Sequence, residues 1–141
     1  MWSNTFRIEG NLITDRLNRL EIDFLRYVLK KDFDLTPMQI NVVFLTAQGA
    51  SIGDAIDLLS VSASTFNHHL NKALFKMSCK HRYELTAKFW SLVSLIESKK
   101  IWDIVASKHF EIPMEQVTEE HRDLAKQLYY MFLWAEIEER R

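Results

Sequence analysis

The stretch "LTPMQINVVFLTAQGASIGDAIDLLSVSASTFNHHLNKALFKM", residues 35–77, contains three helix starts in close succession. The candidate N-cap residues are Thr36, Ser51 and Ser62. At the first start, Pro37 suits the first helical turn and Gln39 can complete a capping box. Gly49 follows the first helix where a left-handed terminator is expected. The stretch therefore predicts a helix up to about residue 48, a short helix ending near residue 59 and a longer helix up to about residue 77.

The third helix has two distinct sides when its residues are spaced at about 100°. Its apolar side consists of Phe66, Leu70, Ala73, Leu74 and Met77. The other side consists of Ser64, Asn67, His68, Asn71 and Lys72, with Phe75 near its centre. We expect the apolar side to be buried and the polar side to be exposed. Helix, tight turn, short helix, turn and longer helix is the element order of a helix-turn-helix.

The flanking sequence also predicts helices, after an extended arm at residues 1–10. Apolar residues recur at helical spacing from about residue 14 to residue 31, and again at 82–99. The later helix either continues or bends through residues 101–105, and "HFEIP" then breaks it. Thr118 and two glutamates open a final, largely apolar helix. We therefore predict an all-α fold, in which a helix-turn-helix core of four helices has an N-terminal helix and a C-terminal helical extension.

Composition narrows the classes of function. The 141 residues carry a formal net charge of −1, and only three are Gly and two are Pro. The single cysteine, Cys79, excludes an intramolecular disulfide and fits a reducing cytoplasm. No signal peptide is apparent, and no apolar run approaches the ~20 residues that span a bilayer. We expect a soluble cytoplasmic protein without a membrane partner.

Catalysis and metal binding find no support in the sequence. No nucleophile lies beside a plausible base, and no glycine-rich phosphate loop is present, so we expect neither an enzyme nor a cofactor. His68 and His69 are adjacent, whereas metal ligands on a helix favour a spacing of four residues, so no metal is expected. We expect His68 to face outward, His69 to pack or cap, and Cys79 to be a buried inert thiol.

Residues 35–85 resemble the LuxR/GerE-type helix-turn-helix domain without a gap. The landmarks are Leu35-Thr36-Pro37, Val42-Val43, Ala47-Gln48-Gly49, Leu59, Val61-Ser62, Thr65, His69, Leu74, Lys76 and Arg82. The resemblance covers a little over a third of the chain. It suggests a helix-turn-helix domain at 35–90, preceded by an N-terminal arm and helix at 1–34. The flanks at 1–34 and 91–141 resemble no known family, and the largely apolar final helix predicts that the helical extension at 91–141 serves dimerisation or packing.

The resemblance implies a bacterial, sequence-specific transcription regulator that binds double-stranded DNA as a homodimer, with one recognition helix per half-site. The expected base contacts are Asn67, His68 and Asn71. The expected phosphate contacts are Ser64, Thr65, Lys72 and Lys76. The expected dimer or partner surface comprises Phe75, Leu85, Phe89, Val93, Ile96, Leu128, Met131 and Trp134.

An alternative function stays open because the family usually has lysine or arginine at several positions that here hold Asn67, Asn71 and Phe75. Residues 35–90 contain five Lys/Arg and three Asp/Glu, a net charge of only +2. Few cations mean few phosphate contacts. The alternative is a protein-interaction module, an anti-regulator or co-regulator, that binds another transcription regulator and binds DNA weakly or not at all by itself. A third possibility is DNA binding in which a partner contributes the missing positive charge.

Overall fold

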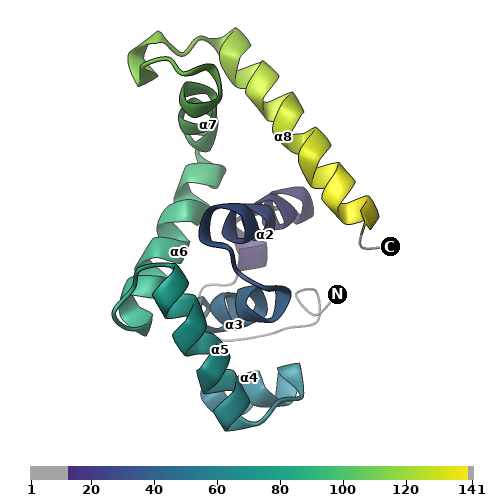
Figure 1. The fold of residues 1–141 in the computed structure, drawn as a ribbon, viewed down its shortest axis with the longest axis vertical. Coiled ribbons are helices and arrows are strands. Elements are labelled where there is room, and N and C mark those ends of the chain that lie inside the picture. The colour runs from purple at the N-terminus through teal and green to yellow at the C-terminus, as the bar shows by residue number, and fades with distance from the viewer. Residues whose placement is uncertain (1–12, 140–141) are drawn as a thin grey trace. The chain divides into compact units, whose positions relative to one another are not determined.

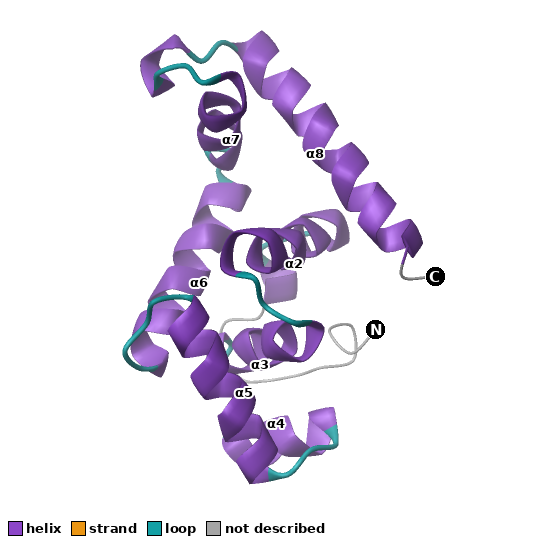
Figure 2. Cartoon of the chain, in the orientation of Figure 1, coloured by secondary structure: helices purple, strands orange, loops and turns teal. Residues whose placement is uncertain are grey.

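The structure is a computed structural model that describes residues 13–139, with side chains placed up to residue 131. Over these residues the chain consists of helices joined by short turns, without any strand (Figure 1, Figure 2). The predicted all-α class is therefore confirmed. No helix in the described range is long and apolar enough to cross a membrane. The arm expected at residues 1–10 lies outside the described residues.

The elements follow one another in a simple order. They are η1 (Ile13–Asp15), α2 (Arg19–Phe33), α3 (Pro37–Ala47), α4 (Ile52–Leu59), α5 (Ala63–Lys76), α6 (Arg82–Glu97), α7 (Ile101–Phe110), η2 (Met114–Gln116) and α8 (Glu119–Glu139). The chain divides into two compact units, Met1–Val93 and Ser94–Arg141. The division predicted from the sequence, at residues 34/35 and 90/91, stays a prediction.

The predicted start and end of α3 are confirmed. The Gln39 N–H donates to the Thr36 hydroxyl at 3.2 Å, and the Thr36 N–H donates to the Gln39 side-chain oxygen at 3.0 Å. Pro37 occupies the first helical position, where its missing N–H costs nothing. Beyond the helix, Gly49 has a φ of 86°, in the left-handed region that glycine enters without strain.

One boundary differs from the sequence-based expectation, and an alternative left open at another is decided. The first long helix was expected from about residue 14, but α2 begins only at Arg19. Asn18 forms a capping box with Glu21, at 2.8 and 3.0 Å, and this box starts the helix anew after η1. The helix expected at 82–99 could either continue or bend, and the structure shows the bend, because α6 stops at Glu97 and Lys99 has a φ of 67°. The chain therefore bends there, and α7 is a separate helix.

Helices α3, α4 and α5 share one apolar core within the first unit. Its buried members are Val42, Leu45, Ala55 and Phe66. The half-buried Ile56, Leu59 and Leu70 pack around them. Burying these side chains supplies most of the stabilisation that holds the short helix α4 in place, because eight residues are too few for a stable helix in water.

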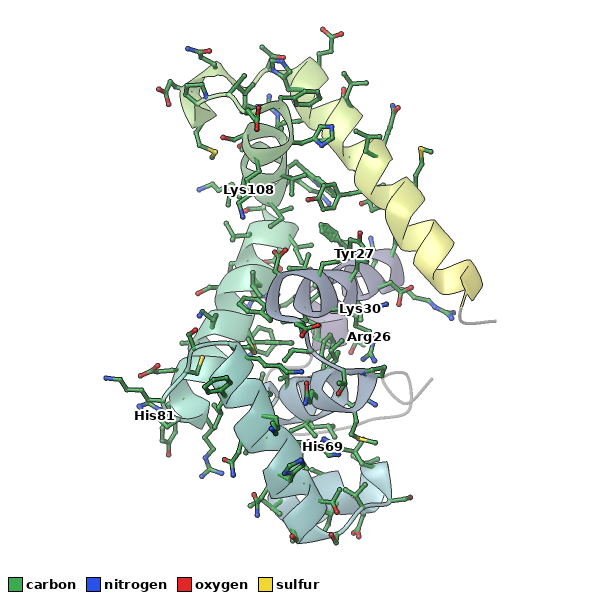
Figure 3. All side chains as sticks on the ribbon, viewed as in Figure 1. Arg26, Tyr27, Lys30, His69, His81 and Lys108 are labelled. Atoms are coloured by element: carbon green, nitrogen blue, oxygen red, sulfur yellow. The ribbon has the colours of Figure 1, made fainter. Side chains whose placement is uncertain are left out.

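Polar contacts attach α2, η1 and α6 to this core. Arg26 of α2 donates to the Asn41 side chain at 2.9 Å, and its guanidinium carbon lies 5.3 Å from the centre of the Phe44 ring (Figure 3). Gln48 is buried, accepting the Ile13 N–H at 2.8 Å and donating to the Phe44 carbonyl at 3.0 Å. From α6, the Trp90 indole donates to the carbonyl at the end of α3 at 2.8 Å.

The second unit is built on α7 and α8, which pack against each other. The buried Trp102 ring contacts the rings of Tyr129 and Tyr130 edge-on, with centres 6.4 and 5.5 Å apart. Arg122 of α8 forms an ion pair with Asp103 of α7 at 2.9 Å. Aromatic packing and this ion pair hold the helical extension together.

Candidate nucleic-acid interface

Helix α5 is positioned by its cap and by its apolar side. The Ser62 hydroxyl accepts the Thr65 N–H at 3.1 Å, which satisfies one of the free donors at the helix start. The side chains of Phe66, Ala73 and the following Met77 are buried, and α5 packs against both α3 and α4. The connection from α4 is only three residues long, and Ser60 turns the chain with a φ of 55°.

The opposite side of α5 is open to solvent. Its exposed side chains are Ser64, Asn67, His68, Asn71, Lys72 and Phe75. The predicted division of this helix into a buried and an exposed side is therefore confirmed. No residue of α5 is acidic, so the exposed side offers amide, hydroxyl, imidazole and ammonium groups without a carboxylate that would repel phosphate.

Thr65 is exposed but already takes part in the cap of the helix. The Thr65 hydroxyl accepts a hydrogen bond from the Ser62 hydroxyl at 3.0 Å, and the Thr65 backbone N–H donates to the Ser62 hydroxyl oxygen. Ser64, by contrast, lies exposed in the first turn of α5. Both lie at the N-terminal end of α5, where the helix dipole favours an anion.

Lys76 differs from the other expected phosphate contacts. Its ammonium donates to the Asp34 carbonyl at 2.8 Å and to the Gln39 side-chain oxygen at 2.9 Å. These bonds connect the end of α5 to the α2–α3 junction and engage the cation within the fold. A phosphate would have to compete with both, so among the two lysines of α5 only Lys72 remains directed at solvent.

We expect Lys76→Ala to lower the free energy of unfolding by about 1–2 kcal/mol, because two bonds from a charged donor are lost. Lys72→Ala is the matched control. It removes the same side chain from an exposed position of the same helix and should change stability by less than about 0.5 kcal/mol. Urea denaturation followed by circular dichroism measures both. Equal stabilities of the two variants would contradict the structural role of Lys76.

The two adjacent histidines differ in their surroundings. The His68 ring is exposed, whereas His69 is half-buried, with the ring centres 5.7 Å apart. The His69 Nδ1 is buried without a hydrogen-bond partner among the described residues (Figure 3). Within the described part of the chain, no group of three His, Cys, Asp or Glu side chains is placed to hold a metal ion.

The expected contact surface on α6 requires a correction. Leu85, Phe89, Val93 and Ile96 are all buried within the chain itself. The Phe89 ring packs edge-on against Phe44, with centres 5.1 Å apart and planes at 79°. These side chains form core and cannot contact a second chain without opening the fold. The exposed side of α6 instead carries Tyr83, Ala87 and Ser91.

The other expected interface residues differ in how far their side chains are exposed to solvent. Phe75 is 83% exposed and Met131 is 67% exposed, whereas Leu128 is half-buried. The side chain of Trp134 lies outside the described residues. Phe75 and Met131 are thus large apolar side chains that the described residues leave uncovered.

Cys79 is half-buried rather than fully buried. Its thiol donates to the Met77 carbonyl at 3.5 Å. Burial raises the pKa of the Cys79 thiol above its ordinary value, and the nearby Lys88 only partly offsets this effect. The thiol therefore stays protonated at neutral pH, which disfavours a reactive thiolate.

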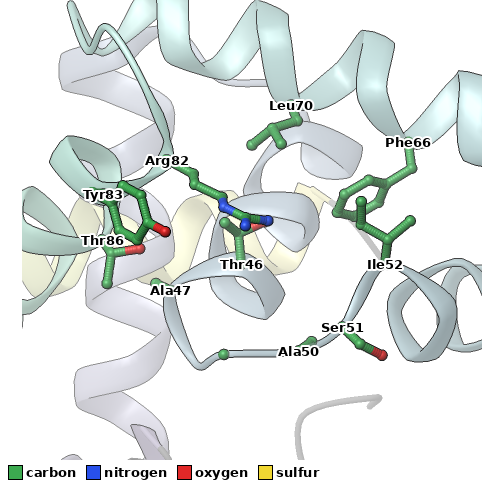
Figure 4. Close-up of a pocket in the computed structure, with 11 residues that line it drawn as sticks. Thr46, Ala47, Ala50, Ser51, Ile52, Phe66, Leu70, Arg82, Tyr83 and Thr86 are labelled. Carbon is green, nitrogen blue, oxygen red and sulfur yellow. The ribbon is translucent and has the colours of Figure 1, made fainter.

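The first unit contains an open cavity of about 420 Å³ that the sequence does not predict. Its walls come from the end of α3, the start of α4, the inner side of α5 and the start of α6 (Figure 4). Arg82 is the only charged residue in this lining. No local pattern could reveal the cavity, because its residues are brought together by packing of four separate elements.

Comparisons of the chain with models of known families, with curated proteins and with solved structures find no match.

Proposed function

We propose that the chain is a sequence-specific DNA-binding transcription regulator, in which α3–α6 form a helix-turn-helix domain of the LuxR/GerE type. The observation that carries this proposal is the exposed side of α5. It presents Asn67 and His68 on one turn and Asn71 on the next turn of a helix that a three-residue turn joins to α4. Asparagine side chains can bond adenine through N6 and N7 in the major groove.

Backbone geometry after α5 also supports the resemblance. The family commonly has glycine where this chain has Ser78, directly after the recognition helix. Ser78 has a φ of 56°, in the left-handed region that favours glycine. A serine thus adopts here the left-handed conformation that favours glycine, which is the residue that the family commonly has at this position.

In this proposal, Asn67, His68 and Asn71 contact base edges, while Ser64, Thr65 and Lys72 contact phosphates. Two copies act together in the cytoplasm, with their recognition helices about 34 Å apart, one DNA turn. A dimer contact through α6 would use its exposed side, around Ala87 and Ser91, and α8 offers Met131 as a further contact.

The direct test is binding of the full chain to mixed double-stranded DNA fragments, measured by fluorescence anisotropy. Binding should be detectable at about 50 mM salt and weaken roughly a hundredfold by about 200 mM, if a dimer neutralises about four phosphates. The expected slope of log affinity against log salt is shallow because α5 has few free cations. Absence of binding at low salt would overturn DNA binding by the chain alone.

A second candidate function is binding of another transcription regulator through the same helix. The specific observation in its favour is Phe75, which lies 83% exposed on the outer side of α5, one turn from Asn71. An aromatic side chain at this place suits a protein partner better than a phosphate. Undetectable DNA binding at low salt would favour this function over the first.

A further inference from the structure

The open cavity of about 420 Å³ beneath the inner side of α5 lies within the size range of small-molecule sites, and Arg82 and Tyr83 in its lining are exposed to solvent. Figure 4 shows its two contrasting walls. Phe66 and Leu70 from α5 and Ile52 from α4 form an apolar wall, and the start of α6 supplies the Arg82, Tyr83 and Thr86 side chains opposite. The cavity therefore joins an apolar surface to a polar, positively charged one.

Arg82 is directed into this cavity. Its side chain extends from the start of α6 toward Thr46 (Figure 4). Its guanidinium carbon lies 5.8 Å from the centre of the Tyr83 ring. No hydrogen bond or ion pair holds the guanidinium within the described part of the chain. A planar fork of N–H donors is thus available for a carboxylate, which arginine binds through two parallel bonds.

The start of α4 adds a second favourable feature. Ser51 caps the helix by accepting the Asp54 N–H at 3.1 Å, and both Ser51 and Ile52 line the cavity. The first N–H groups of a helix have no partner inside it and carry the positive end of the helix dipole. The eleven lining residues include one cation and no carboxylate, which favours a ligand with a single negative charge.

We propose that this cavity binds a small organic monocarboxylate with an apolar body. The carboxylate lies at the Arg82 guanidinium, and the apolar body packs against Phe66 and Leu70. The site lies on the inner side of α5, whereas Asn67 and Asn71 lie on the outer side, so the proposal does not rest on DNA binding.

The test is a titration of the isotope-labelled full chain with 3-phenylpropionate, followed by amide resonances. We expect saturable shifts of Ile52, Gly53 and Tyr83. The neutral analogue 3-phenylpropanamide should bind about tenfold more weakly or worse, because it lacks the charge that strengthens the bond to arginine. Arg82→Gln should weaken binding of 3-phenylpropionate by a similar factor. Lys72→Gln, on the outer side of α5, is the matched control and should leave the affinity unchanged.

A second variant narrows the cavity without removing Arg82. Thr86→Leu adds bulk to the lining and should also weaken the binding of 3-phenylpropionate, while an unchanged melting temperature reports an intact fold. Three results would overturn the proposal. They are no saturable shift at about 10 mM 3-phenylpropionate, equal affinity for the amide, or undiminished binding by Arg82→Gln.

Discussion

Phe44→Ala is expected to lower the free energy of unfolding by about 3–5 kcal/mol, which is the usual loss for a buried phenylalanine. Phe44 is fully buried in α3, and its ring meets Phe89 of α6 edge-on at 5.1 Å. The substitution removes this contact, leaves a cavity between the two helices and takes away the ring beside the Arg26 guanidinium. Urea denaturation followed by circular dichroism measures the effect.

Phe75→Ala provides the control with the same chemical change. Phe75 is 83% exposed, so its truncation should alter the free energy of unfolding by no more than about 0.5 kcal/mol. Because both variants replace phenylalanine with alanine, a difference in their free energies of unfolding reports the effect of burial. A loss of less than about 1 kcal/mol in Phe44→Ala would contradict the packing of α6 against α3.

Most of the helix boundaries that depend on a local signal could be predicted from the sequence. Thr36 and Gln39 are three residues apart, and their capping box depends on nothing else in the fold. The buried and exposed sides of α5 could likewise be predicted, because the helical periodicity of apolar residues places Phe66 and Asn67 on different sides. The start of α2 was missed although its signal is equally local. Leu17 precedes the capping box of Asn18 and Glu21 and continues the apolar helical spacing, so the spacing alone placed the start of the helix too early.

The roles of single side chains were harder to predict, because their partners are distant in the sequence. Lys76 bonds Asp34 and Gln39, 42 and 37 residues away, and only the fold shows that this lysine is engaged. On α6, the apolar spacing of Leu85, Phe89 and Val93 is the same for a helix that faces its own core and for one that faces a partner. Periodicity cannot distinguish these two cases, whereas burial does.

The joint substitution Asn67→Ala with Asn71→Ala is expected to abolish sequence preference while leaving the fold intact. Each asparagine that bonds a base through two atoms contributes about 1–3 kcal/mol of discrimination against the wrong base. Both side chains are exposed, and alanine favours a helix more than asparagine, so stability should not fall. Binding is compared on a DNA sequence selected by the wild-type chain from a random library and on unrelated DNA.

Lys72→Ala separates base contacts from phosphate contacts on the same exposed side of α5. It should weaken binding to all sequences alike and reduce the slope of log affinity against log salt by about one per subunit. The asparagine variant should instead retain the salt slope, because phosphate contacts carry no direct sequence information. If the asparagine variant keeps its preference for the selected sequence, Asn67 and Asn71 do not contact the bases, even where salt-dependent binding persists. The exposed side of α5 would then face phosphates or a protein partner, and Phe75 would be the next residue to test.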